Sequence, residues 1–188
     1  WIKPTVTSGK RMLIDIGGLD NGMALRFNNN DLIGGIASGS SRTAVTLSNF
    51  AGNTNWISGQ WNHVALVYDA TSITLYLNGV SVQSNTLLAF STVANSVSPS
   101  RIGNTGNTNA FNDNTGYSTW TGSIDNLYII RGALSASEID SLRQNIFIPS
   151  SALTLAAPAA PVIPTALTAT ALNTDAVLLS WNDNSSDE

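Results

Sequence analysis

The sequence predicts an all-β protein in which two antiparallel sheets pack face to face. Three observations support this: a meander of three strands between Gln60 and Val82, a composition poor in helix formers, and one helix-capping signal late in the chain. Roughly a third of the residues are Ser, Thr or Asn, which favour turns over helices. We therefore expect short strands joined by turns over most of the chain.

Two turns define the meander. Asn78-Gly79 is a strong hairpin signal, because both residues tolerate the positive φ of a type I′ turn. The other turn centres on Ala70-Thr71. Together they predict the cross-strand pairs Val64–Leu77, Leu66–Leu75, Tyr68–Ile73, Leu77–Val80 and Leu75–Val82, with all eight side chains on one face. A slip of one residue in either turn would scatter this set over both faces.

The other strands are predicted from short or alternating apolar runs. They cover residues 1–4, 11–16, 22–28, 32–37, 43–47, 100–103, 120–131, 167–172 and 177–181. Residues 87–97 and 104–116 are predicted as loops. Ser135 and Glu138 form a capping box that begins the one predicted helix. This helix is expected to reach about Asn145 and to bury Ile139, Leu142 and Ile146.

A change of composition after this helix divides the chain. Residues 1–148 are predicted as the sandwich without its N-terminal strand, 149–164 as a Pro- and Ala-rich linker, and 165–188 as the first strands of an incomplete second domain. Two explanations fit these ends: the chain is a piece of a longer one, or another segment completes each sheet by strand addition.

Charge and composition limit the classes of partner. The net charge of −4 and the pI of about 4.7 argue against nucleic acid, because there is no basic patch to contact phosphates. No apolar run approaches the roughly 18 residues that span a membrane. Without cysteine there can be no disulfide or thiolate metal site. The low charged fraction of 11% and the many Ser, Thr and Asn residues favour an extracellular or cell-surface location.

The acids and the single histidine argue against catalysis. Glycoside hydrolysis needs two carboxyl groups that flank the scissile bond. The chain has only two glutamates, Glu138 in the helix cap and Glu188 at the end, and no predicted strand carries alternating acids. His63 has no second His or Cys as a partner and is expected to have a structural, hydrogen-bonded role. We predict no enzymatic activity for these residues.

A long polar loop offers the best candidate ligand site. Between residues 104 and 120 lie Phe111, Asn112, Asp113, Asn114, Tyr117 and Trp120. Amides and a carboxylate can bind sugar hydroxyls while an aromatic face packs against the sugar ring. The alternative is that the Asn and Gly residues shape turns and the aromatic residues cover the core.

Three segments together resemble the laminin G-like, pentraxin-like branch of the concanavalin A-like jelly rolls. They are Trp1-Ile-Lys-Pro4, the pair Trp61-Asn-His-Val-Ala-Leu-Val-Tyr68 and Leu75-Tyr-Leu-Asn-Gly79, and the pair Gly122-Ser-Ile-Asp-Asn-Leu-Tyr-Ile-Ile130 and Ala133-Leu-Ser-Ala-Ser-Glu-Ile139. Their order and spacing are similar to the family from Trp1 to about Gln144. The tail from Pro164 is similar to the opening strands of a fibronectin type III domain, with Trp181 at its core tryptophan position.

The resemblance implies a two-sheet jelly roll in a secreted multidomain protein of bacterial type. Its expected function is a non-catalytic carbohydrate-binding or adhesion module, with a glycan or a cell-surface or matrix protein as partner. The alternative is a structural spacer, or a subunit of a surface assembly that self-associates through exposed sheet edges and has no small ligand.

The same resemblance suggests one metal ligand. Asp125 shares its predicted strand face with Leu127 and Ile129, so we expect its carboxylate to point inward. In the resembled family this Asp lies near a first-strand loop where Ca²⁺ can bind. The alternative is that the carboxylate accepts backbone N–H bonds from a neighbouring loop. Asp15, Asp20 and Asp31 are expected to form turns.

Overall fold

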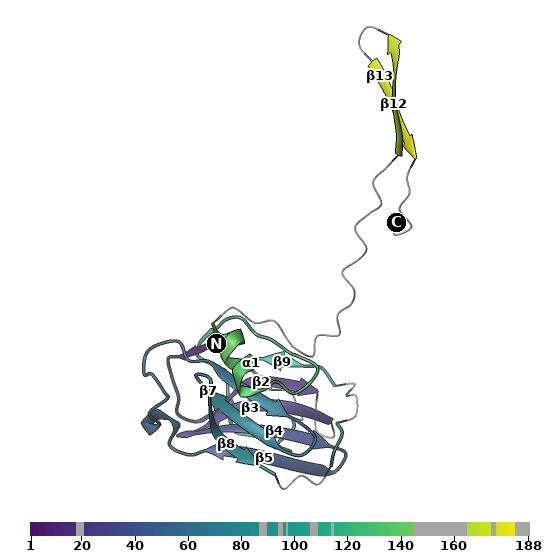
Figure 1. Ribbon diagram of the computed structural model, residues 1–188. Coiled ribbons are helices and arrows are strands. Elements are labelled where there is room, and N and C mark those ends of the chain that lie inside the picture. The colour runs from purple at the N-terminus through teal and green to yellow at the C-terminus, as the bar shows by residue number, and fades with distance from the viewer. Residues whose placement is uncertain are drawn as a thin grey trace. The chain divides into compact units, whose positions relative to one another are not determined.

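The computed structural model describes residues 1–144, except 18–20, 87–89, 94–95, 97, 106–108 and 114, together with strands 165–173 and 176–182. The chain divides into two units, residues 1–150 and 151–188, which are described separately. Unit 1 consists mainly of antiparallel strands with one short α-helix, which confirms the predicted β-sandwich (Figure 1).

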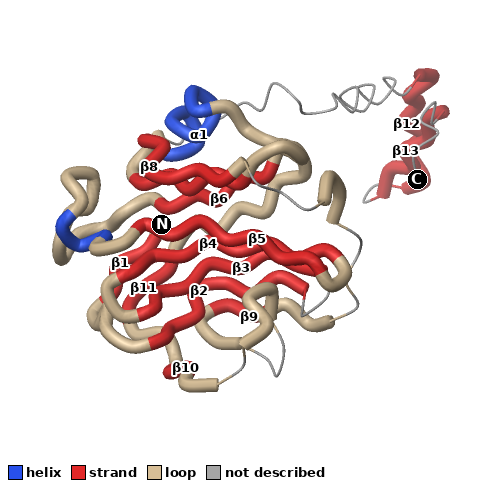
Figure 2. Tube along the Cα trace, turned by 90° about the horizontal axis from the view of Figure 1, so that it is seen from below, coloured by secondary structure: helices blue, strands red, loops and turns tan. Residues whose placement is uncertain are grey.

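The larger sheet contains four long antiparallel strands in sequential order and two short strands on β2. Its members are β2 (Lys10–Gly17), β3 (Asn21–Asn28), β4 (Asp31–Ser38), β5 (Ser41–Leu47), β9 (Arg101–Ile102) and β10 (Tyr117–Ser118). Strand β9 pairs antiparallel and β10 parallel with β2 (Figure 2). The parallel strand β10 lies between the predicted loop 104–116 and the predicted strand 120–131 and was not predicted.

The predicted meander forms the core of the second sheet. Its strands are β6 (Val64–Tyr68), β7 (Ile73–Leu77) and β8 (Val80–Asn85). Asn78 and Gly79 have φ values of 51° and 86°, as a type I′ turn requires. Beside this sheet, β1 (Ile2–Pro4) pairs with β11 (Gly122–Ile124), and Ile2 also forms a bridge to Asn62.

The register of the meander confirms four of the five predicted pairs. The exception is Leu75, which lies opposite Gln83 instead of Val82. A β-bulge lies between the Leu75 and Tyr76 pairs, where β8 carries one extra residue, and it shifts the pairing of Leu75. Val80 is also 47% exposed, so it does not belong to the buried face as predicted.

Aromatic residues fill the space between the two sheets. Phe27 of β3 is fully buried and stacks on Phe50 and Trp120, with ring centroids 4.5 and 5.7 Å apart. Trp56 contacts Phe27 edge-on at 6.3 Å. Leu75 of β7 belongs to the same buried cluster and contributes from the second sheet. Burial of these large side chains supplies the main hydrophobic stabilisation of the unit.

The outer face of the larger sheet is also covered. Met12, Ala24 and Ala37 form a second buried cluster with Ala110, and Phe111 and Tyr117 pack against it. A Cβ atom on Gly35 would lie only 2.3 Å from the Phe111 ring, so this glycine lets the loop approach the sheet closely. The loop that follows β9 is therefore a third layer over the larger sheet.

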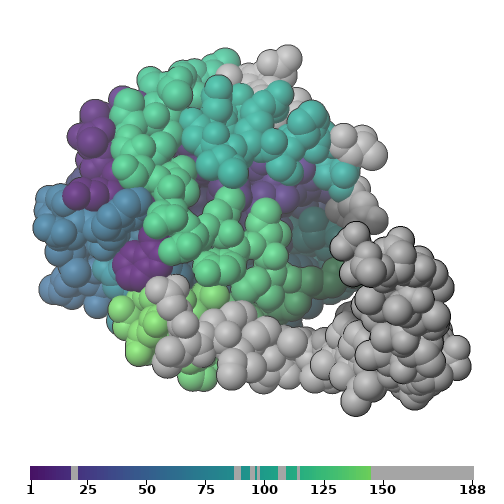
Figure 3. All heavy atoms as spheres, turned by 90° about the horizontal axis from the view of Figure 1, so that it is seen from above, coloured from purple at the N-terminus to yellow at the C-terminus, as the bar shows by residue number. Residues whose placement is uncertain are grey.

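One predicted strand near the surface differs from the structure. The predicted strand 120–131 is reduced to β11, and residues 125–130 form no regular ladder. Asn126 has a φ of 48°, which turns the chain away from strand geometry. Leu127 and Ile129 are consequently 44% and 68% exposed, and Figure 3 shows this segment in green at the surface. A short 3₁₀ helix, η1 (Phe50–Gly52), was not predicted.

The predicted α-helix is confirmed as α1 (Ala136–Arg143), with Ser135 as its N-cap. The Ser135 hydroxyl accepts the backbone N–H of Glu138, and the Glu138 carboxylate accepts the N–H of Ser135, so both halves of the capping box form. Ile139 and Leu142 are buried as expected. Ile146, the third expected contact, lies outside the described residues.

In unit 2, β12 (Thr165–Asn173) and β13 (Ala176–Asn182) pair antiparallel, as the two predicted strands require. The register is irregular between Thr165 and Thr168 and again before Asn173. The assignment of unit 2 to the start of a second domain stays a prediction from the sequence.

We predict that Gly35→Ala destabilises the protein by about 1–3 kcal/mol, because the new methyl group overlaps the Phe111 ring. Chemical denaturation of Gly35→Ala, Phe111→Ala and the double variant measures the coupling. The Gly35→Ala change should cost much less in the Phe111→Ala background. Equal costs in both backgrounds would show that the loop does not pack against Gly35.

Candidate functional site

The predicted ligand loop is anchored to the outer face of the larger sheet by Arg26. Since Phe27 points into the core, the preceding side chain on β3 points outward. The Arg26 guanidinium Nη1 donates to Asp113 Oδ2 at 2.8 Å and to the Tyr117 hydroxyl at 2.5 Å. Its central carbon lies 4.0 Å from the centroid of the Phe111 ring. One cation thus holds a carboxylate, a phenol and an aromatic face.

Lys10 brings a second cation to the same carboxylate. Its Nζ lies 3.1 Å from Asp113 Oδ2 and 5.5 Å from the Tyr117 ring centroid, and it also donates to the Thr115 carbonyl. The Lys10 and Asp113 side chains are 28% and 30% exposed, whereas the Arg26 side chain is only 11% exposed. Arg26 is the buried anchor, and Lys10 and Asp113 are accessible to a ligand.

We call Lys10, Arg26, Phe111, Asp113 and Tyr117 the loop cluster. It carries two positive charges and one negative charge, which gives a local net charge of +1 on a protein whose overall charge is −4. Lys10 and Asp113 present a donor and an acceptor beside the face of Tyr117. Such a group can bind hydroxyl and carboxylate oxygens and can stack against an apolar ring face.

A buried polar network supports the loop from below. Asn109 is fully buried, and its side-chain amide donates to Thr105 Oγ1 at 3.2 Å and to the Asp113 carbonyl. The Asn109 side-chain oxygen accepts the Phe111 N–H at 2.9 Å. Thr105 Oγ1 in turn donates to Asp15 Oδ2 at 3.1 Å. The network connects β2 to the loop cluster and fixes the shape of the loop.

Sequence reasoning missed two members of this network. Asp15 was expected in a turn, but it lies within β2 and is fully buried. The available signal was that Asp15 lies inside a predicted strand, where side chains alternate between the two faces of the sheet. Asn109 resembled the other Asn residues of the loop, and no sequence signal distinguished it. Among the other predicted turn acids, Asp31 is the first residue of β4, and Asp20 lies outside the described residues.

Opposing effects act on the two ionisable groups that face Arg26. Partial burial alone would raise the pKa of Asp113, but hydrogen bonds from Arg26, Tyr117 and Lys10 outweigh it and hold that pKa below its usual range. Burial raises the pKa of Tyr117 to about 12, despite the nearby Arg26 cation. At neutral pH the carboxylate is therefore charged and the phenol neutral.

The structure brings together only some of the predicted ligand residues. Asp113 and Tyr117 share the loop cluster, and Asn112 is exposed beside them with a φ of 56°. Trp120 stacks on Phe27 and therefore belongs to the inner face of the larger sheet. Asn114 lies outside the described residues.

The prediction that Asp125 points inward is wrong. Asp125 is exposed, and its Oδ1 accepts the N–H of Asn126 at 2.8 Å. Its backbone exchanges two hydrogen bonds with Trp1 and so extends the pairing between β1 and β11. The described residues contain no group of three or more His, Cys, Asp or Glu that could hold a metal. The Ca²⁺ site at Asp125 stays a prediction from the resemblance.

His63 is 5% exposed, and its ring lies edge-on to Trp1 with centroids 5.4 Å apart. Its Nδ1 has no hydrogen-bond partner among the described residues. Burial, reinforced by the N-terminal amine and Arg143, lowers the pKa of His63 to about 4, although Asp140 acts in the opposite direction. The ring is therefore neutral at physiological pH, which fits a packing role.

No helix in the described part of the chain has both the length and the apolar character that crossing a bilayer requires.

The fold and the covered larger sheet define a concanavalin A-like sandwich. The family model described as "Concanavalin A-like lectin/glucanases superfamily" matches residues 1–140, and the chain belongs to this family. No curated protein matches the chain.

Three solved structures are similar to the chain at low identity, and the first of them shares its fold. A carbohydrate-binding module (CBM40) of the Ruminococcus gnavus IT-sialidase, solved with α2,3-sialyllactose, is 17% identical with a TM-score of 0.58, over 75% of this chain and 78% of that one. An S-layer domain-containing protein from Clostridium thermocellum is 22% identical (TM-score 0.38; 76% and 66% covered). The binding domain of botulinum neurotoxin serotype C1 is 12% identical (TM-score 0.46; 78% and 35% covered).

We expect Asp113→Asn to destabilise the protein by about 1–3 kcal/mol, because it removes the anion that compensates the buried Arg26 cation. Asp125→Asn is a matched control, since it changes an exposed carboxylate outside the cluster. Its effect should stay within about 0.5 kcal/mol. Urea unfolding of the two variants measures the loss of stability in each. Similar losses in the two variants would contradict the anchoring role of Asp113.

His63 should make the protein sensitive to mild acid. Its folded-state pKa of about 4 lies below the unfolded value of 6.5, so the unfolded chain binds the proton first as the pH falls. Stability contributed by the neutral ring is complete above pH 6.5 and is lost between pH 6.5 and about 4, by up to about 3 kcal/mol. Melting temperatures over this range should fall less in His63→Gln. An unchanged slope in that variant would refute this assignment.

Proposed function

We propose that unit 1 is a non-catalytic glycan-binding module of an extracellular or cell-surface protein. The observation that carries the proposal is the accessible Lys10–Asp113 pair, 3.1 Å apart, beside the Tyr117 ring on the outer face of the larger sheet. Hydrogen-bonding groups beside an aromatic surface can bind sugar hydroxyls and pack against the sugar ring. Arg26 and Asn109 hold these groups in place before any ligand arrives, which lowers the entropic cost of binding.

The charge of the cluster favours an acidic glycan. With Lys10 and Arg26 opposed by Asp113 alone, the local surplus is positive, and a sugar carboxylate would offset it. A carbohydrate-binding module of similar fold was solved with sialyllactose, which is an acidic glycan, and this supports the proposal. Since Lys10 is partly exposed, its contribution should weaken as salt increases.

A structural spacer without a small ligand is the second candidate. It is favoured by one observation: Asp113 already accepts hydrogen bonds from two cations within the chain, which also suits a loop that only covers the sheet. The two candidates differ in whether Lys10 and Tyr117 bind anything besides the chain itself.

For unit 2, we propose the beginning of a fibronectin type III domain. The antiparallel pairing of β12 with β13, two consecutive strands, supports this proposal.

We predict that the wild-type chain binds acidic glycans on an array, and that Lys10→Gln and Tyr117→Ala reduce binding at least tenfold. Asn112→Gly should weaken it less, since glycine retains the positive φ and removes only the exposed amide. Tyr128→Ala is a matched control, because Tyr128 is 50% exposed and lies outside the cluster. Circular dichroism checks that each variant is folded. An array without binding would contradict the proposal and favour the spacer.

A further inference from the structure

The sequence contains two Asn-Gly pairs, Asn21-Gly22 and Asn78-Gly79. Asparagine deamidates fastest before glycine, because no side chain hinders the attack of the glycine backbone nitrogen on the carboxamide. The two pairs lie in different surroundings. Asn78-Gly79 forms the type I′ turn between β7 and β8, whereas Asn21-Gly22 begins β3. The same reactive dipeptide is thus held in two different ways.

Both amide hydrogens and the oxygen of the Asn78 side chain are hydrogen-bonded. Its Nδ2 donates to the Asn55 carbonyl at 2.6 Å and to Asn62 Oδ1 at 2.9 Å. Its Oδ1 accepts the His63 N–H at 2.7 Å, and the Asn78 N–H donates to the His63 carbonyl at 2.8 Å. The Asn78 side chain therefore joins the β7–β8 turn to the loop that precedes β6.

Asn62 carries this network into the loop formed by residues 53–62. It is fully buried, and its Oδ1 and Nδ2 bond the N–H and the carbonyl of Ile57, each at 2.8 Å. Trp56, the preceding residue, packs against the buried core cluster between the two sheets. The amide of Asn78 thus helps to hold a loop that contributes to the core.

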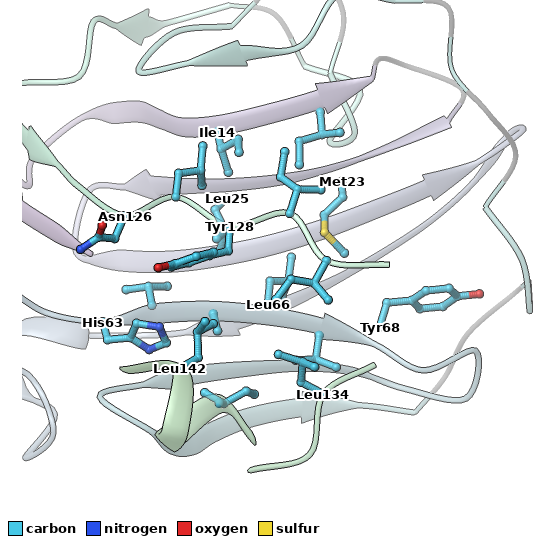
Figure 4. A pocket seen from close by; sticks show the side chains of 18 of the residues that line it. Ile14, Met23, Leu25, His63, Leu66, Tyr68, Asn126, Tyr128, Leu134 and Leu142 are labelled. Carbon is cyan, nitrogen blue, oxygen red and sulfur yellow. The ribbon is translucent and has the colours of Figure 1, made fainter. Parts of the chain in front are cut away.

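The Asn78-Gly79 turn is also enclosed by α1. The His63 ring and Leu142 of α1 line the same apolar cavity, which has a volume of about 290 Å³ (Figure 4). On the turn itself, a Cβ atom added to Gly79 would lie only 2.8 Å from Asp140 Oδ1 of α1. Close packing against Gly79 limits the backbone movement that attack on Asn78 requires.

We propose that Asn78 is a deamidation site that the folded protein protects, and that its conversion releases residues 53–62 from the turn. The Gly79 backbone nitrogen gives its proton to water and bonds to Asn78 Cγ, while Nδ2 takes a proton from water and leaves as ammonia. Water then opens the succinimide at either C–N bond, which yields aspartate or isoaspartate. Since Cγ must turn towards the Gly79 nitrogen, the three side-chain hydrogen bonds have to break first.

Deamidation would reverse the hydrogen-bonding character of the site. A carboxylate has no hydrogen to donate, so it would face the Asn55 carbonyl and Asn62 Oδ1 as another acceptor. Only the bond from the His63 N–H could persist. Isoaspartate would also lengthen the backbone of a two-residue turn. This proposal is independent of the glycan-binding proposal, because none of these residues belongs to the loop cluster.

Deamidation rates at the two Asn-Gly pairs test the protection. Peptide mass spectrometry follows each site in the full chain at mildly alkaline pH, with and without urea. In the unfolded chain Asn21 and Asn78 should react at similar rates, because only the dipeptide then matters. In the folded chain Asn78 should react at least about tenfold more slowly than in the unfolded chain. Equal rates at Asn78 in the two states would overturn the proposal.

Asn62→Ala separates local from global opening. It removes one acceptor from the Asn78 amide, so the folded-state rate at Asn78 should rise about fivefold, as the loss of one hydrogen bond predicts. Asn21 belongs to the larger sheet, and its side chain accepts the Gly39 N–H at 3.2 Å, so its rate should not change. An equal rise at both sites would show that global unfolding controls Asn78, and would overturn the proposal.

Asn78→Asp reproduces one product of the reaction. It should lower the Tm by at least about 4 °C and speed hydrogen exchange of the Ile57 amide at least about tenfold. Asn112→Asp is a matched control, because Asn112 also has a positive φ and is exposed, and it should shift the Tm by less than about 2 °C. A wild-type Tm and wild-type Ile57 protection in Asn78→Asp would overturn the proposed release of residues 53–62.

Discussion

The alternation of side chains along β3 is the constraint on which the rest of unit 1 depends. Phe27 points inward, where Phe50, Trp56 and Trp120 surround it and the second sheet closes over it. Its neighbour Arg26 points outward and gathers the loop that follows β9. A strand repeats every two residues, so neither side chain could move to the other face without reversing the whole strand. The hydrophobic core and the candidate site are therefore fixed by the same register.

This arrangement gives the candidate site an unusual division of roles. The strongest hydrogen bonds of the loop cluster are buried and hold Asp113 and Tyr117 in place, while the more exposed Lys10 remains accessible to a ligand. A site built in this way is formed before binding. The entropy lost in ordering its side chains is lost when the domain folds and not when a ligand binds. The outer face is consequently both a structural layer and a candidate binding surface, which fits a loop that contains both buried aromatic residues and exposed amides.

Much of the fold could be predicted because the decisive signals are local. The Asn78-Gly79 turn, the capping box at Ser135 and the alternation in the meander each depend on a few neighbouring residues. The errors arise where distant parts meet. The bulge in β8 and the conformation of Asn126 depend on the surroundings of their strands, and no local pattern indicates them. The sequence identified the loop with Asp113 and Tyr117, but not the partners Arg26 and Lys10, which are about 90 or more residues away.

The most direct test of this account is hydrogen exchange in Arg26→Met, which retains the length of the side chain and removes its charge. Amide protection of Phe111 and Asn112 should fall at least tenfold in this variant, because the charged hydrogen bonds that hold the loop are lost. Protection in β7 should remain, since Phe27 and the inner core are untouched. Unchanged protection at Phe111 and Asn112 in a folded variant would contradict the claim that Arg26 builds the candidate site.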